Sequence, residues 1–193
     1  IRGKNKEQKY LIELLMDDAI SVVAVNSAAG TGKSFLCTAV ALNKVMSNGS
    51  GYDKILYVKP LEAMGGKDIG YLKGEKNIKL LDGYSGTITN VLENIFSERD
   101  KKYRNFSYAE DLIERGLLQV EAMTFMRGMS YNRTFLIIDE ASNISKKDIK
   151  NILTRCGEGS KCCIIGDADQ IDGNKLTVLD NGLQHVIEKL KGE

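Results

Sequence analysis

Short apolar runs alternate along the chain with longer segments in which apolar residues recur every three or four positions. The apolar runs span residues 21–25, 55–58, 135–138 and 162–165. Continuous runs of this length are typical of strands that are covered on both faces, as in a parallel sheet. A shorter strand is expected over residues 118–121.

The segments between these runs carry the spacing of amphipathic helices. Helices are expected over residues 6–16, from Lys33 onward, over 88–95, within 109–118, over 146–153 and over 183–190. Residues 61–79 contain four glycines and predict an irregular, functional loop. Because strands alternate with helices, we expect an α/β fold in which helices flank a mostly parallel sheet. Ligands of such folds bind at the carboxyl ends of the strands.

The composition is typical of a folded, soluble domain. With 193 residues, of which 42% are hydrophobic, the chain is long enough to bury the core of one compact domain spanning residues 1–193. No apolar run approaches the roughly 20 residues of a membrane span, and residues 1–4 lack the hydrophobic segment of a signal peptide. We therefore expect a cytoplasmic protein with no membrane partner. With a net charge of +1, the protein as a whole does not attract the negatively charged backbone of a nucleic acid. Any RNA contact must therefore rest on local clusters of positive side chains.

The cysteines and the histidine give no sign of a metal site. Cys37, Cys156, Cys162 and Cys163 form no CxxC pair and lie among apolar residues. We expect reduced, buried thiols rather than a zinc site or a disulfide framework. His185 is the only histidine; it could act as a base, but its place in a helical pattern favours a surface or packing role.

A phosphate-binding motif lies between the first expected strand and the helix after it. Residues 27–34 read Ser-Ala-Ala-Gly-Thr-Gly-Lys-Ser. The pattern Gly-x-x-x-x-Gly-Lys-[Ser/Thr] places backbone amides around phosphate groups, a lysine on the β and γ oxygens and a hydroxyl on Mg²⁺. Lys33 and Ser34 supply the last two groups here, while Ser27 replaces the first glycine. The segment predicts a site for a nucleoside triphosphate with Mg²⁺.

Acidic and amide side chains follow two of the other strands. Asp139 and Glu140 come directly after residues 135–138, which is the arrangement of a Walker B motif with an adjacent catalytic carboxylate. We expect Asp139 to hold Mg²⁺ through water, and Glu140 to orient and polarise the attacking water. The alternative is an acidic pair that caps a helix.

The last expected core strand is followed by Gly166-Asp167-Ala168-Asp169-Gln170. A glutamine at this end of the sheet can hydrogen-bond both the γ-phosphate and the lytic water, so Gln170 is expected to act as a γ-phosphate sensor. In the alternative reading, Asp167 caps a helix and Gln170 only fills a loop.

Taken together, these segments resemble the PhoH-like ATPase family, whose members are relatives of the superfamily 1 helicase motor domain. The matching segments are, in order, Asn5 to Tyr10, Ser27 to Ser34, Lys59-Pro60, Ile69 to Gly74, Met126 to Ser130, Asp139 to Asn143, Leu153 to Gly157 and Ser160 to Asp172. The departures from the family pattern are Lys59 for arginine, Lys73 for proline, Ser142 for glutamine and Ser27 for glycine. They favour a divergent, phage-type member.

The resemblance implies a single RecA-like P-loop NTPase domain that hydrolyses ATP with Mg²⁺, is linked to RNA metabolism and phosphate starvation, and forms rings that are often hexamers. Gln8 is expected to contact adenine. The expected nucleotide-binding residues are Gln8, Ser27, Ala28, Ala29, Gly30, Thr31, Gly32, Lys33, Ser34, Phe35 and Arg127. The expected catalytic residues are Lys33, Glu140, Gln170 and Arg155, and the expected metal-binding residues are Ser34 and Asp139.

The expected active site calls for a second subunit. Helicases related to this fold close the ATP cleft between two motor domains, and an arginine crosses that cleft to neutralise the transition state. Only one such domain fits in this chain, which favours a head-to-tail homo-oligomer. Arg155 and Arg127 are the candidate donors. Pairing of either arginine with a local carboxylate is the alternative.

RNA or another single-stranded nucleic acid is a candidate partner. The cations considered for this contact are Lys59, Lys67, Lys73, Lys76, Lys79 and those of residues 99–106, where cations alternate with aromatic side chains. A solvated helix end also explains residues 99–106. Two rival functions stay open, a nucleoside or small-molecule kinase and a nucleotide-gated RNA-binding scaffold. The pair of Glu140 and Gln170 favours water, not a substrate hydroxyl, as the attacking group.

Overall fold

A five-stranded sheet forms the centre of the protein in the computed structural model, which describes residues 1–47, 49–60, 87–96, 108–123, 126, 128–171 and 176–191. The strands are β1 (Val22–Asn26), β2 (Lys54–Lys59), β3 (Leu118–Ala122), β4 (Thr134–Ile138) and β5 (Lys161–Gly166). Their order across the sheet is β1-β5-β4-β2-β3, and every pairing between them is parallel. The expected α/β fold with a mostly parallel sheet is therefore confirmed.

Helices form in each segment whose apolar spacing predicts one. They are α1 (Lys6–Met16), α2 (Lys33–Met46), a helix over residues 87–96, α4 (Tyr108–Glu114), α5 (Lys146–Leu153) and α6 (Gly182–Leu190), with a 3-10 turn η3 (Ala141–Asn143) after β4. Side-chain caps fix three of the starts, because Asn5, Ser145 and Asn181 each accept a hydrogen bond from a backbone N–H in the first helical turn. In the part of the chain that the structure describes, no helix is long and apolar enough to cross a membrane.

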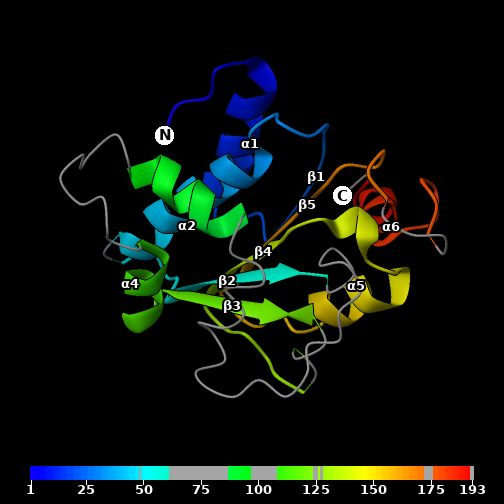
Figure 1. The fold of residues 1–193 in the computed structure, drawn as a ribbon. Coiled ribbons are helices and arrows are strands. Elements are labelled where there is room, and N and C mark those ends of the chain that lie inside the picture. The colour runs from blue at the N-terminus through cyan, green and yellow to red at the C-terminus, as the bar shows by residue number, and fades with distance from the viewer. Residues whose placement is uncertain are drawn as a thin grey trace.

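The two faces of the sheet carry separate hydrophobic cores. Along β2, Ile55 and Tyr57 pack into one core, whereas Leu56 and Val58 pack into the other. This alternation follows from the two-residue period of a strand. Helices α1, α2, α4 and the helix over 87–96 contribute to the first core, and α5 and α6 to the second, so the sheet is covered on both sides (Figure 1).

The cysteines are free thiols, as the sequence predicts. Cys37, Cys162 and Cys163 are buried in the two cores, while Cys156 is half-buried after α5. His185 is half-buried on α6.

Candidate functional site

The phosphate-binding motif forms the turn between β1 and α2. Gly30 and Gly32 have φ angles of 75° and 87°, a left-handed conformation that side-chain-bearing residues rarely adopt. Gly32 caps the start of α2. Position 27 does not require a glycine, because the φ angle of Ser27 is not positive. Its hydroxyl instead lies 2.9 Å from the Thr31 hydroxyl, so the serine that replaces the first glycine closes the loop with a hydrogen bond.

Lys33 and Ser34 begin α2, where the free backbone N–H groups and the helix dipole favour an anion. The Lys33 ammonium donates to the carbonyl oxygens of Ser27 at 3.0 Å and Ala28 at 3.1 Å. The lysine therefore folds back over its own loop. Ser34 Oγ donates to Asp139 Oδ2 at 3.2 Å, which joins the P-loop to the end of β4.

The Ser34 and Asp139 oxygens fit the ligand preference of Mg²⁺. Mg²⁺ takes oxygen ligands, keeps several waters and is usually held by one or two protein groups together with substrate phosphates. Among the residues the structure describes, no cluster of three or more His, Cys, Asp or Glu side chains could hold a metal by itself. Ser34 and Asp139 are thus the groups that would hold Mg²⁺ beside a bound triphosphate.

Tyr57 fixes Asp139 from the neighbouring strand, a contact that the sequence did not reveal. The Tyr57 hydroxyl donates to Asp139 Oδ2, and the tyrosine is fully buried. Burial, together with the nearby Asp139 carboxylate, raises the pKa of Tyr57 well above its ordinary value, so its hydroxyl keeps its proton. Asp139 Oδ1 accepts a hydrogen bond from the Glu140 backbone N–H at 2.9 Å. Asp139 is therefore oriented by donors on both of its oxygens.

Glu140 has an unusual backbone and an unexpected partner. Its φ and ψ angles are 54° and 39°, and for a residue other than glycine this conformation costs on the order of 1–3 kcal/mol. Its Oε1 lies 2.5 Å from the Lys59 ammonium, which also donates to Thr87 Oγ1 at 3.0 Å. Lys59, one of the cations considered for RNA, is only 9% exposed and faces the interior of the site.

Asp167 ties the end of β5 to the P-loop. Its Oδ2 accepts a hydrogen bond from the Ala29 backbone N–H at 3.0 Å, and its Oδ1 accepts one from the Asp169 N–H at 3.1 Å. Gln170 is exposed, and its backbone carbonyl accepts a hydrogen bond from Ser142 Oγ at 3.2 Å. Asp167 thus positions the loop, while the Gln170 side chain lies at the mouth of the site.

A cleft of about 470 Å³ brings most of the expected catalytic and metal-binding residues together. The functional side chains that line it are Lys33, Ser34, Thr87, Asp139, Glu140 and Gln170. The strand order explains this convergence, because β5 lies between β1 and β4 and the carboxyl ends of parallel strands meet at one edge.

Gln8 lies on the other side of the P-loop, in a second hollow of about 320 Å³. Its Nε2 donates to the Thr31 carbonyl at 2.9 Å, and its Oε1 accepts from the Lys4 N–H at 2.8 Å, so the orientation of the side-chain amide is fixed. Phe35 is 39% exposed on the first turn of α2 and lines neither hollow. Arg127 lies outside the described residues, as do the RNA candidates in residues 61–86 and 97–107.

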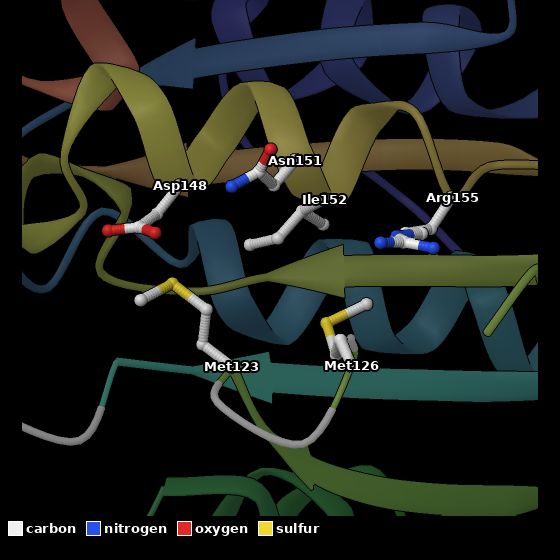
Figure 2. A pocket seen from close by; sticks show the side chains of 6 residues that line it. All are labelled: Met123, Met126, Asp148, Asn151, Ile152 and Arg155. Carbon is white, nitrogen blue, oxygen red and sulfur yellow. The ribbon is translucent and has the colours of Figure 1, made fainter. Parts of the chain in front are cut away.

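Arg155 is remote from this cleft. It follows α5 and lies near the amino end of β4, where its carbonyl accepts a hydrogen bond from the Tyr131 N–H at 2.8 Å and its guanidinium donates to the Met129 carbonyl at 3.4 Å. Figure 2 shows Arg155 at the rim of a small pocket of about 180 Å³, which is lined by Met123, Met126, Asp148, Asn151, Ile152 and Arg155. The five residues of β4 span roughly 16 Å between this rim and Asp139. Arg155 therefore does not line the cleft of its own chain.

Comparisons with known proteins identify the family of this chain. The profile of a family described as PhoH-like protein matches residues 1–193. Protein PhoH2 of Bacillus subtilis (strain 168) is 40% identical over 193 residues, which are 100% of this chain and 42% of that protein. Protein PhoH2 of Mycolicibacterium smegmatis is 32% identical over 192 residues, 100% of this chain and 41% of that protein.

A PhoH-like protein of Bacillus subtilis (strain 168) is 32% identical over 194 residues, 100% of this chain and 55% of that protein. The chain thus spans about half the length, or less, of these relatives. The resemblance drawn from the sequence motifs is confirmed, and the chain belongs to the PhoH-like protein family of P-loop domains.

Proposed function

We propose that this domain binds ATP with Mg²⁺ and hydrolyses it, with water as the nucleophile. The observation that carries the proposal is the single cleft that Lys33, Asp139, Glu140 and Gln170 all line. A triphosphate that lies along the P-loop and the start of α2 directs its γ-phosphate toward the ends of β4 and β5. The groups at those ends are the ones that hydrolysis requires.

Each side chain has a role that follows from its chemistry. Lys33 exchanges its loop carbonyls for the β and γ oxygens of the nucleotide, and Mg²⁺, when held by Ser34 and Asp139, neutralises charge on the same phosphate groups. Glu140 orients the attacking water and accepts its proton. Gln170 carries both a donor and an acceptor, so it can contact the γ-phosphate and the water together.

The base is proposed to be adenine because of Gln8. A glutamine amide pairs with the donor and acceptor on the N6 and N7 edge of adenine. Thr31 and Lys4 occupy only one hydrogen of the Gln8 amide nitrogen and one lone pair of its oxygen. The remaining hydrogen and lone pair are available to the base.

Phosphate release from a panel of nucleoside triphosphates tests the proposal, measured with Mg²⁺ or EDTA and with or without single-stranded RNA. We expect release from ATP that requires Mg²⁺. Transfer of phosphate to an added nucleoside, with none released by water, would identify a kinase. Tight ATP binding without any phosphate release would identify a nucleotide-gated scaffold.

Replacing Lys33 with Ala is expected to weaken ATP binding on the order of a hundredfold or more, because it removes charge-assisted hydrogen bonds to two phosphate groups. Calorimetric titration with ATP and Mg²⁺ measures the change. Lys146→Ala is the matched control: Lys146 lies on α5, pairs with Asp180 at 3.0 Å and does not line the cleft, so its loss removes the same charge from a residue outside the phosphate site. Equal affinities in the two variants would remove Lys33 from the phosphate site.

The active assembly is proposed to be a head-to-tail homo-oligomer, a hexameric ring, that acts on RNA. The position of Arg155 supports the assembly, because an arginine outside its own cleft is free to serve a neighbouring one. The proposed link to RNA rests on the family resemblance and on the cations in residues 61–86 and 97–107.

A further inference from the structure

Tyr57 and Ser34 together occupy one of the two carboxylate oxygens of Asp139. The Tyr57 hydroxyl and Ser34 Oγ both donate to Oδ2. The other oxygen, Oδ1, accepts from the Glu140 N–H at 2.9 Å, and no further donor to Asp139 lies within the part of the chain that the structure describes. Because each carboxylate oxygen has two lone pairs, Oδ2 is saturated and Oδ1 keeps one lone pair.

The sheet holds the Tyr57 hydroxyl in place. Tyr57 lies within β2, opposite Ile137 of β4 and Val120 of β3, and its side chain is fully buried in the core to which α1 and α2 contribute. Asp139 is itself only 4% exposed. A rigid donor on a nearly enclosed carboxylate keeps Oδ2 occupied. Asp139 therefore has a single free acceptor position, on Oδ1, for a group that enters the cleft that it lines.

One free acceptor position suits Mg²⁺ better than Ca²⁺. Mg²⁺ requires nearly ideal octahedral geometry and keeps several of its waters, whereas Ca²⁺ takes about six to eight oxygen ligands in flexible arrangements and often binds both oxygens of a carboxylate. With one position, Asp139 can accept a hydrogen bond from water in the shell of Mg²⁺, but it cannot give both of its oxygens to the larger cation. Ser34 donates its proton to Asp139 and so keeps its own lone pairs for either cation.

We propose that Tyr57 is a positioning residue that makes the site selective for Mg²⁺ over Ca²⁺, because it keeps Asp139 from presenting both oxygens to the cation. The inference rests on the proposed binding of ATP with a divalent cation. Tyr57 acts through Asp139 and contacts neither the nucleotide nor the cation. Loss of its hydroxyl is enough to open the second oxygen, since Ser34 fills only one of the two lone pairs on Oδ2.

Tyr57→Phe tests this role, since phenylalanine fills the same space in the core and lacks only the hydroxyl. The measurement is the ratio of two affinities for a non-hydrolysable ATP analogue, one with Mg²⁺ and one with Ca²⁺, obtained by calorimetric titration. The wild type is expected to favour Mg²⁺. Tyr57→Phe is expected to lower the ratio about tenfold, the effect of losing one hydrogen bond to a charged group. An unchanged or higher ratio overturns the proposal.

Tyr52→Phe is the matched control. Tyr52 is also a buried tyrosine that donates to an aspartate, Asp18, at 3.1 Å, but neither of these two residues lines the nucleotide cleft. Its loss is expected to remove the same kind of hydrogen bond and to leave the ratio unchanged. A ratio that falls as far in Tyr52→Phe as in Tyr57→Phe would trace the effect to a general loosening of the fold and would overturn the proposal.

A double-mutant cycle shows whether Tyr57 acts through Asp139. Asp139→Asn removes the charge to which the hydroxyl donates, and it is expected to weaken binding of the analogue with either cation. In that background, Tyr57→Phe is expected to leave the ratio unchanged. A fall of full size that persists in the double variant would mean that Tyr57 acts on the cation by another route, and it overturns the proposal.

The same titrations separate this inference from the proposed function. If the analogue binds and Tyr57→Phe lowers the ratio, yet the wild type does not hydrolyse ATP, the role of Tyr57 stands and the hydrolysis proposal fails. If the analogue binds and the ratio does not move, only the role of Tyr57 fails. A wild type without a preference for Mg²⁺ overturns the inference with no substitution needed, and a wild type that binds the analogue with neither cation contradicts both proposals.

Discussion

Glu140→Gln is expected to bind ATP with unchanged affinity and to lower its turnover by roughly 10²- to 10⁴-fold, the range that a positioned general base contributes. Glutamine keeps the shape and the hydrogen-bonding reach of the side chain but cannot accept the proton of the attacking water. The Lys33 and Ser34 contacts to phosphate do not involve this residue. Titration with ATP and single-turnover phosphate release measure the two effects separately.

Two controls make the Glu140 result specific. Glu158→Gln makes the same chemical change at an exposed residue beyond α5 and should leave both quantities unaltered. Thermal unfolding of Glu140→Gln is needed because the change removes the negative charge that contacts the Lys59 ammonium, so a lower unfolding temperature is expected. Loss of ATP affinity as large as that of Lys33→Ala would show that Glu140 holds the nucleotide and is not the base.

The elements of the fold were predictable because their signals are local. A run such as residues 135–138 is apolar at every position, and all of it is buried in β4, since the strand has helices on both sides. The first residue of the helix that begins at Lys33 was predicted correctly from the sequence. The glycine before it, Gly32, is the left-handed cap at which the helix starts. The spacing of apolar residues and the residue types of turns depend only on residues that are close in sequence. Both can therefore be recognised before the fold is known.

The partners of the two carboxylates at the end of β4, Asp139 and Glu140, were not predictable in this way. Tyr57 and Lys59 reach Asp139 and Glu140 only because β2 lies beside β4, with Val58 opposite Ile138. The strand order is decided by packing across the whole sheet, and no local pattern reports it. Tyr57 did carry one usable signal, since a tyrosine in an otherwise apolar strand needs a hydrogen-bond partner. Lys59 carried none, and its charge suggested the surface.

The position of Arg155 makes it a candidate for a contact between subunits. The sequence places it after a helix and before a glycine-rich turn, and the structure places it at the rim of a small pocket with Asp148 and Asn151 (Figure 2). The cleft of its own chain lies at the carboxyl ends of the strands, whereas Arg155 lies near their amino ends. If Arg155 contributes to hydrolysis, the cleft that it serves belongs to another copy of the chain.

Arg155→Ala is therefore expected to bind ATP and to assemble, but to hydrolyse ATP about 10³-fold more slowly, the lower bound for an arginine that neutralises a phosphoryl-transfer transition state. Under the proposed assembly, in which a neighbouring subunit completes the site, activity per subunit of the unaltered protein should rise with protein concentration. Arg115→Ala is the control, since Arg115 pairs with Asp111 on the surface at 3.2 Å. Sedimentation of both variants shows whether assembly is intact.

Mixing two inactive variants gives the decisive result. Lys33→Ala protein cannot use its own cleft, yet it carries an intact Arg155, whereas Arg155→Ala protein has a working cleft and no arginine to donate. When Lys33→Ala is added in excess, some interfaces combine a working cleft with a working arginine, and hydrolysis should recover. Mixtures that co-assemble without recovering activity would exclude Arg155 as the donor between subunits and would leave Arg127 as the remaining candidate.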